Sequence, residues 1–299
     1  MISRVFIPPI KCQGIKSKLV SWILKNIEYK ECKRWIEPFM GSGVVGFNAQ
    51  HPNAIFGDIN PHIINFYNSL KSSEITPLFV KQFLEGEGKY LKERGSEHFY
   101  FIRERFNKFH DPLDFLFLSR AGFNGMIRFN SKGKFNVPFC QKPLRFSKSY
   151  ITKIVNQVNF VCQSIKMKNW NFVCGDFSEL IMKANSNDFI YCDPPYLGRH
   201  VDYYNSWDVK EENNLSRCLK STNAKFILST WHSNRYRAND FIERNWRGFH
   251  ILTMEHFYHI GGMEKNRNSI TEALILNYEP PSSCEYATFS RYYQQIALL

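Results

Sequence analysis

The sequence predicts an α/β fold in which seven strands form a doubly wound sheet, with one mostly helical insertion. Three observations support this prediction. Short apolar or aromatic segments alternate with helical patterns along the chain. A glycine-rich turn joins an early strand directly to a helix, and acidic residues follow several strands. In such open sheets, ligands bind at the carboxyl ends of the strands, where we therefore expect the functional site.

Composition and charge limit the classes of protein to which this chain can belong. The 299 residues contain 39 Lys and Arg against 27 Asp and Glu, a net charge of +12. A polyanionic partner explains this charge most simply, and membrane or ribosome contact is the alternative. The eight cysteines show no CxxC pair and no zinc-ligand spacing, which indicates reduced thiols. Without a signal segment or a membrane-length apolar run, we expect a soluble cytoplasmic protein.

The N-terminal loop over residues 6–19 leads into a predicted helix. Apolar residues recur in that helix every four positions, at Leu19, Ile23 and Ile27. Lysines cluster where it begins, at Lys11, Lys16 and Lys18. Because cations at a helix N-terminus oppose the helix dipole, a bound anion would relieve this arrangement. Three solvated lysines are the alternative.

The glycine-rich turn follows the segment Arg34–Glu37. Gly41, Gly43 and Gly46 have the GxGxxG spacing, which lets a backbone approach a nucleotide-like ligand closely. The next strand, residues 54–58, ends in Asp58, an acid placed to accept from both hydroxyls of a ribose. These motifs fit a nicotinamide cofactor or S-adenosylmethionine. The lead-in Glu37-Pro38-Phe39 and a later Asp-Pro-Pro-Tyr motif favour the second. A dehydrogenase would more often have a histidine, lysine or tyrosine with a recognisable partner for hydride transfer, and the sequence shows none.

The strongest chemical motif is Asp193-Pro194-Pro195-Tyr196, directly after the apolar strand over residues 188–192. Each proline fixes its φ and removes an N–H, so this backbone offers carbonyls only. The Asp193 carboxylate and the Pro194 carbonyl could accept both hydrogens of one planar amine, with Tyr196 as a stacking face. Such positioning would activate an exocyclic amine of a nucleobase for methyl transfer. A structural turn at the end of a strand is the alternative.

Residues 67–149 form the expected insertion. Helical patterns with interspersed arginines precede a segment in which Asn124-Gly125 predicts a turn. Ser131-Lys132-Gly133 predicts a hairpin tip between two short aromatic strands. The hairpin contains Arg, Asn, Lys and Phe, which recognise base edges, hold phosphates and wedge between bases. A solvated basic loop is the alternative.

Together, these motifs resemble those of the Dam-type DNA adenine-N6 methyltransferases, in the family's order from the N-terminal loop to the Asp-Pro-Pro-Tyr motif. The resemblance implies a Rossmann-like S-adenosylmethionine-dependent methyltransferase sheet, formed by residues 1–66 and 150–299. It implies that residues 67–149 recognise the target. It also implies S-adenosylmethionine as methyl donor, an adenine flipped out of double-stranded DNA as acceptor, and no metal. A bacterial or phage enzyme, Dam-like or paired with a restriction endonuclease, is the expected context.

The resemblance also assigns roles to individual residues. The cofactor would contact Lys16, Phe39, Gly41, Gly43, Asp58, Asp176, Phe177 and Asp193, and also Cys12, which stands where the family often has an aromatic. The target base would contact Asp193, Pro194 and Tyr196. In the hairpin, Arg128 resembles the arginine that recognises a guanine. The other expected DNA contacts are Asn124, Met126, Asn130, Lys132, Lys134 and Pro138.

Two departures bear on the target sequence. Family members that recognise GATC usually have Leu where this chain has Met126, and a Gly-Arg-Tyr run where it has Cys140-Gln141-Lys142. We therefore expect GATC or a related short site. Methylation of cytosine N4 or of RNA remains an alternative, as does a non-catalytic DNA-binding protein on the same scaffold.

The remaining expectations concern the C-terminal half. Strands are expected over residues 226–230, 251–257 and 270–277. A polar and aromatic loop that includes Arg199, His200, Tyr203 and Tyr204 would close over the flipped base. His232 and His256 are expected to be structural or to face DNA, because the chemistry needs no imidazole. The basic segment over residues 235–247 would lie near DNA.

Overall fold

The structure is a computed structural model that describes residues 4–27, 31–197, 207–257 and 269–281. The loop that was expected to close over the flipped base, with Arg199, His200, Tyr203 and Tyr204, lies outside these residues. Within them, no helix combines the length and the apolar character needed to cross a membrane.

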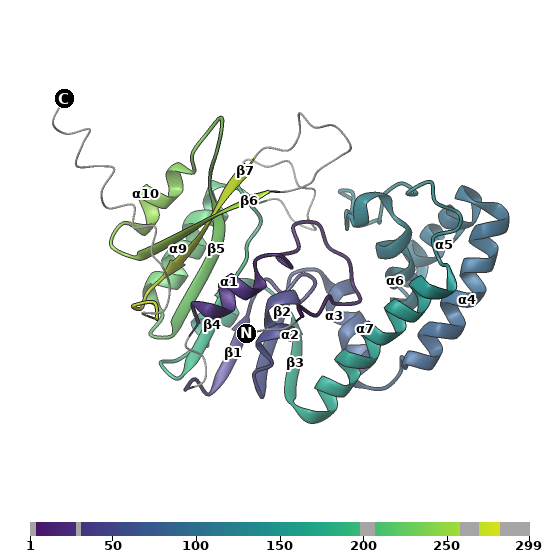
Figure 1. Ribbon diagram of the computed structural model, residues 1–299, viewed down its shortest axis with the longest axis horizontal. Helices are drawn as coiled ribbons and strands as arrows, with labels where there is room; N and C mark the ends of the chain where they lie inside the picture. The colour runs from purple at the N-terminus through teal and green to yellow at the C-terminus, as the bar shows by residue number, and fades with distance from the viewer. Residues whose placement is uncertain (1–3, 28–30, 198–206, 258–268, 282–299) are drawn as a thin grey trace.

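One mixed sheet of seven strands confirms the predicted α/β fold (Figure 1). Its strands are β1 (Arg34–Glu37), β2 (Asn53–Asp58), β3 (Asn169–Cys174), β4 (Asp188–Cys192), β5 (Lys225–Asn234), β6 (His250–Phe257) and β7 (Ser269–Leu276). They lie in the order β3-β2-β1-β4-β5-β7-β6. The first five in this order are parallel, whereas β7 runs antiparallel to both β5 and β6. The sheet is therefore doubly wound up to β5 and ends in an antiparallel pair.

Helices cover both faces of the sheet because successive strand residues point to opposite sides. In β4, Phe189 and Tyr191 join one buried cluster, and Ile190 and Cys192 join the other. The first face is covered by α1 (Val20–Lys25), α2 (Val44–Ala49), α3 (Pro61–Lys71) and α7 (Lys148–Met167). The second face is covered by α8 (Phe177–Met182), α9 (Val209–Ser221) and α10 (Asp240–Trp246).

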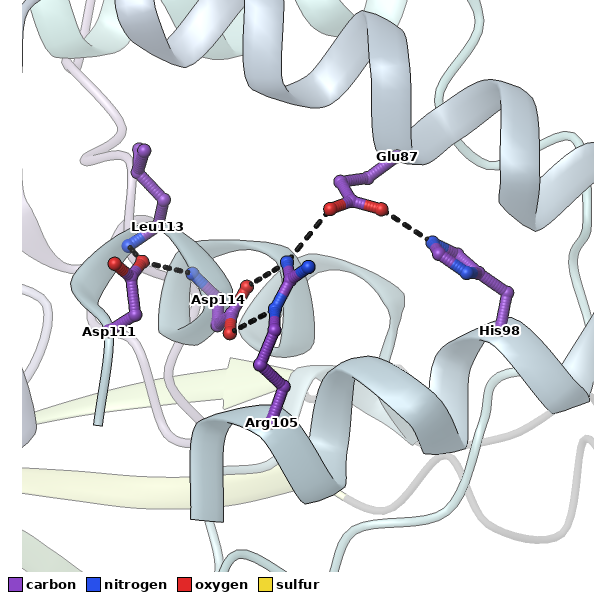
Figure 2. Close-up of polar contacts among 6 residues, drawn as sticks. All are labelled: Glu87, His98, Arg105, Asp111, Leu113 and Asp114. Atoms are coloured by element: carbon purple, nitrogen blue, oxygen red, sulfur yellow. Dashed lines mark hydrogen bonds and ion pairs between the residues drawn. The ribbon is translucent and has the colours of Figure 1, made fainter. Parts of the chain in front are cut away.

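The insertion is mostly helical, as predicted, with α4 (Pro77–Arg94), α5 (Ser96–Phe109) and α6 (Pro112–Ala121). A charged network joins these three helices (Figure 2). Arg105 donates from Nε and Nη2 to Asp114 at 2.9 and 2.6 Å, and from Nη2 to Glu87 at 2.8 Å. Glu87 also lies 2.7 Å from the ring of His98. Apolar residues of all three helices belong to the same buried cluster as the first face of the sheet, so the insertion packs as a continuation of that core.

The expected hairpin forms, but without continuous strands. Asn124 and Gly125 adopt positive φ values of 52° and 65°, which confirms the predicted turn. Isolated antiparallel bridges join Phe129 to Phe135 and Gly122 to Phe139. The two predicted strands are reduced to these bridges and to cross-hairpin backbone bonds such as Asn130 N–H to the Lys134 carbonyl at 2.9 Å and Asn136 N–H to the Arg128 carbonyl at 3.1 Å. Phe129 and Phe135 are buried against the helical insertion, and the Phe135 ring centroid lies 6.0 Å from that of Phe106.

Candidate active site

The carboxyl ends of the parallel strands bring the predicted acidic residues to one edge of the sheet. Asp58 ends β2, Asp176 follows β3 and Asp193 follows β4. The strand order changes direction between β1 and β4. In open α/β sheets, this switch point opens a crevice in which ligands bind.

The glycine turn between β1 and α2 allows α2 to pack closely on the sheet and a ligand to approach the backbone. Gly43 caps α2 with a φ of 77°, in the left-handed region that favours glycine. At Gly46, an added Cβ would collide with the Glu37 carboxyl and the Phe56 ring, so only glycine lets α2 pack this closely on the sheet. At Gly41, an added Cβ would meet nothing within 4 Å. The backbone there therefore leaves room for a ligand.

Asp58 is fixed beside this turn by two backbone donors. Its Oδ2 accepts from the Gly41 N–H at 2.8 Å, and its Oδ1 accepts from the Asn60 N–H at 2.9 Å. Burial raises the pKa of Asp58 to about 6, although both hydrogen bonds oppose the rise. A carboxylate has about four lone-pair sites, so these bonds leave capacity for two hydroxyl groups. This residue fits the expected ribose contact.

An aromatic cluster lies on the same edge. The rings of Phe39 and Phe177 stack with their centroids 5.1 Å apart. Trp207 packs on both, with centroid separations of 5.6 Å. Asp176 caps α8 by accepting from the backbone N–H and the hydroxyl of Ser178. Trp207 was not among the predicted residues, because its position depends on the packing of α9 against α8.

The Asp-Pro-Pro-Tyr motif meets the N-terminal loop. Lys16 Nζ lies 2.8 Å from Asp193 Oδ1 and 4.7 Å from the centroid of the Tyr196 ring. Lys16 is 4% exposed and Asp193 is 21% exposed. The anion expected near the lysine cluster is therefore, for Lys16, a carboxylate of the protein itself. A separate anion site is not needed to explain this lysine.

The charges beside Asp193 shift its pKa in opposite directions. Burial raises the pKa of Asp193, the Lys16 ammonium lowers it, and Glu272 raises it further. Glu272 on β7 is fully buried and accepts a hydrogen bond from the Tyr196 hydroxyl. Glu272 was not among the predicted residues. A single acid within the apolar run of residues 270–277 was the available signal, because a buried carboxylate requires partners.

A further carboxyl lies beneath the glycine turn. Glu37 at the end of β1 is 2% exposed and accepts a 3.0 Å hydrogen bond from Trp35 Nε1. Burial raises the pKa of Glu37 to about 8, and the hydrogen bond from Trp35 opposes the rise. Glu37 is therefore largely neutral at pH 7. Its carboxyl contributes shape and hydrogen bonding, with little added charge beside Asp193.

The remaining predicted cofactor residue, Cys12, lies in the N-terminal loop. Burial raises the pKa of its thiol, and the nearby charge of Asp58 is the second cause. Cys12 packs against the buried cluster on the first face of the sheet. It is suited to packing, since a thiol with a raised pKa is a poor nucleophile.

The hairpin holds its predicted arginine in a defined position. Arg128 donates from Nε to the Asn136 side-chain oxygen at 2.7 Å and from Nη2 to the Asn136 carbonyl at 3.2 Å. The side-chain oxygen of Asn130 accepts from the backbone N–H groups of Lys132 and Lys134, so Asn130 shapes the tip. Asn136 was not among the predicted residues.

The other predicted DNA contacts differ in exposure. Asn124, Asn130, Lys132, Lys134 and Pro138 are exposed, and Met126 is half-buried. The N-terminal loop links this hairpin to the site at Asp193. Lys11 packs on Gly125, where an added Cβ would collide with its aliphatic chain. Only five positions separate Lys11 from Lys16.

The family of the chain follows from comparison with known proteins. A family model described as "D12 class N6 adenine-specific DNA methyltransferase" matches residues 13–260. The chain belongs to this class. It is an adenine-specific DNA methyltransferase that uses S-adenosylmethionine, as the sequence motifs predicted.

Relatives with named activities agree with this assignment. The methyltransferase is 34% identical to a DNA adenine methylase of Vibrio cholerae over 278 residues, which cover 89% of this chain and 94% of the relative. It is 30% identical to the type II methyltransferase M.MjaIII of Methanocaldococcus jannaschii, covering 91% and 99%. It is 33% identical to the DNA adenine methylase of Escherichia coli K12 over 192 residues, covering 62% and 64%.

Proposed function

We propose that this methyltransferase methylates N6 of an adenine that has rotated out of a duplex into a pocket formed by Asp193, Pro194 and Tyr196. The observation that carries the proposal is the position of Asp193. It follows β4 at the switch point of the sheet, with the glycine turn after the neighbouring β1. A base inside a duplex reaches such a site only after extrusion.

Asp193 and the Pro194 carbonyl would accept the two N6 hydrogens and aim the nitrogen lone pair. S-adenosylmethionine, when bound, supplies an electrophilic methyl group on a sulfonium. As the new N–C bond forms, positive charge grows on N6, and an ionised Asp193 stabilises it. Lys16 favours that ionised state against the cost of burial. The S–C bond of the donor would break as the N–C bond forms, with its electron pair left on a neutral thioether sulfur. N6 would then pass one proton to solvent by way of Asp193 and keep the methyl group.

The cofactor contacts are proposed because the residues at the carboxyl edge of the sheet fit S-adenosylmethionine. The open backbone at Gly41 leaves room for a ligand, and Asp58 would accept from its ribose hydroxyls. Phe39 and Phe177 would provide an apolar wall on the same side. Gly43 would line the turn. Cys12, Lys16 and Asp176 would complete the cofactor contacts.

Residues 67–149 are proposed to recognise the target sequence, and residues 1–66 and 150–299 to perform catalysis. Arg128 would donate to O6 and N7 of a guanine, the bidentate contact that arginine makes in the major groove. Its bonds to Asn136 orient the guanidinium before DNA binds. The exposed lysines Lys132 and Lys134 would contact phosphates. We propose GATC or a related short site, with restriction–modification as the expected context.

The direct test is methylation of unmethylated genomic DNA by the purified protein with S-adenosylmethionine, followed by single-molecule sequencing. We expect N6-methyladenine confined to one short motif. Asp193→Ala should abolish methylation while it retains DNA binding, and near-normal activity would refute the proposed base pocket.

The hairpin is tested in the same way. Arg128→Ala should relax the motif or abolish it, whereas Lys183→Ala serves as a control on the exposed end of α8. An unchanged motif in the Arg128 variant would refute the role of the hairpin in recognition.

A further inference from the structure

The turn after β5 projects beyond the edge that carries the site. Leu228 of β5 pairs with Cys192, the last residue of β4, and β5 continues to Asn234. A β-bulge between Trp231 and Ser233 takes up one residue, so five steps along the paired β7, at ~3.3 Å each, place Asn234 about 17 Å beyond that level. The extension is supported by β7, where Ile270 pairs with Asn234. Figure 1 shows the segment between β5 and α10 rising above the rest of this part of the sheet.

The turn itself is closed by local hydrogen bonds. The Asn234 side chain accepts from the N–H groups of Tyr236 and Arg237 at 2.9 and 3.0 Å. The Asn234 N–H donates to the Arg237 carbonyl at 2.9 Å, and a bridge joins Ser233 to Ala238. These bonds hold three consecutive side chains on a tight tip.

The tip is basic and exposed. Arg235, Tyr236 and Arg237 are all exposed, and Tyr236 retains 75% of its accessible surface. The guanidinium of Arg237 lies 5.0 Å from the ring centroid of the buried Trp231, which orients it. Residues 232–239 contain no acidic residue. The surface thus offers two cations and a hydroxyl, the groups that commonly donate to phosphate oxygens.

We propose that this turn, Arg235–Arg237, binds the phosphate backbone of the duplex on the side of the site away from the hairpin. The inference rests on the proposed function, which places the duplex over the carboxyl edge of the sheet. In Figure 1 the turn after β5 and the segment between α6 and α7 lie on opposite sides of the N-terminal loop. A duplex from which one base is extruded would be held at both flanks by this arrangement.

The test is the salt dependence of DNA binding. The variant Arg235→Gln/Arg237→Gln is compared with Lys33→Gln/Lys183→Gln, which removes the same charge from the amino edge of the sheet. Lys33 precedes β1, and Lys183 follows α8 at the start of the turn that leads into β4. Dissociation constants are measured by fluorescence anisotropy over a range of salt concentrations. One duplex contains the motif that the enzyme methylates, still unmethylated, and the other duplex lacks this motif.

Each lost phosphate contact lowers the slope of log K against log[salt] by about 0.9, so the turn variant should lose up to about 1.8 in slope on both duplexes. The control pair should keep the wild-type slope. Equal slopes in the two variants would overturn the proposal. Arg235→Lys/Arg237→Lys keeps the charge and should keep most of the slope. If the double Gln variant does not fold, Arg235→Gln alone should lose about 0.9.

The methylation assay separates this inference from the proposed function. With DNA at saturating concentration, the turn variant should methylate the same motif at the wild-type rate. An unchanged salt slope together with normal methylation would refute the phosphate contact of the turn and leave the proposed function intact. Absence of N6-methyladenine in DNA treated with the wild-type protein would refute the proposed function, whatever the slope of log K against log[salt].

Discussion

Replacing Glu37 with glutamine should stabilise the protein at neutral pH. The pKa of Glu37 is raised from 4.5 to about 8 by burial. The folded protein therefore keeps a proton that the unfolded chain releases, and folding becomes less favourable as pH rises from about 4.5 to about 8. The cost is ~1.4 kcal/mol per pH unit, or about 3 kcal/mol at pH 7. Glu37→Gln keeps the shape and an acceptor for Trp35 Nε1, and it has no proton to lose.

The measurement is urea unfolding of the wild-type protein and of Glu37→Gln at several pH values between 5 and 9. Subtracting one free energy of unfolding from the other at each pH cancels the contributions of the other titrating groups. The difference should grow in favour of the variant by ~1.4 kcal/mol per pH unit and level off near pH 8. A difference that stays constant from pH 5 to pH 8 would show that Glu37 ionises normally and refute the argument.

Three further predictions concern the recognition hairpin and the base site. Asn136→Ala removes the side-chain acceptor that orients the hairpin arginine, so the ratio of kcat/KM between the preferred site and a site changed at one base should fall by about tenfold, ~1.4 kcal/mol; an unchanged ratio contradicts this. Tyr196→Phe and Glu272→Gln should show a coupling of ~1 kcal/mol in a double-mutant cycle of unfolding free energies, whereas additive effects would deny that their hydrogen bond matters. Burial raises the pKa of Asp193 and Lys16 opposes the rise, so the rate of single-turnover methylation should fall with decreasing pH at a pH above the usual pKa range of aspartate. Lys16→Met should move this fall in rate to higher pH, and an identical pH profile in the Lys16 variant would exclude this electrostatic role.

Much of the fold and part of the site could be predicted because their signals are local. The strand before Asp193, the glycine spacing at Gly41 and the turn at Asn124 are each specified within a few neighbouring residues. The structure contains all seven expected strands. The antiparallel placement of β7 between β5 and β6 was not predicted, because strand order depends on packing between distant segments.

The residues that the sequence analysis missed act through long-range contacts. Glu272 accepts from a tyrosine 76 positions earlier in the chain, and no spacing rule connects the two. Trp207 becomes part of the site only because α9 packs against α8 and brings it onto Phe39 and Phe177. Asn136 could be recognised as a partner of Arg128 only once the hairpin was known to place them opposite each other.

The N-terminal loop offers a physical connection between recognition and chemistry. Arg120 of α6 donates to the carbonyls of Pro8 and Pro9, which anchors the loop to the insertion. Beyond this anchor, Lys11 packs on the turn that begins the hairpin, and Lys16 pairs with Asp193. This short and anchored segment therefore joins the hairpin directly to the base site, where Lys16 lowers the pKa of Asp193, the group that is proposed to receive the adenine amine.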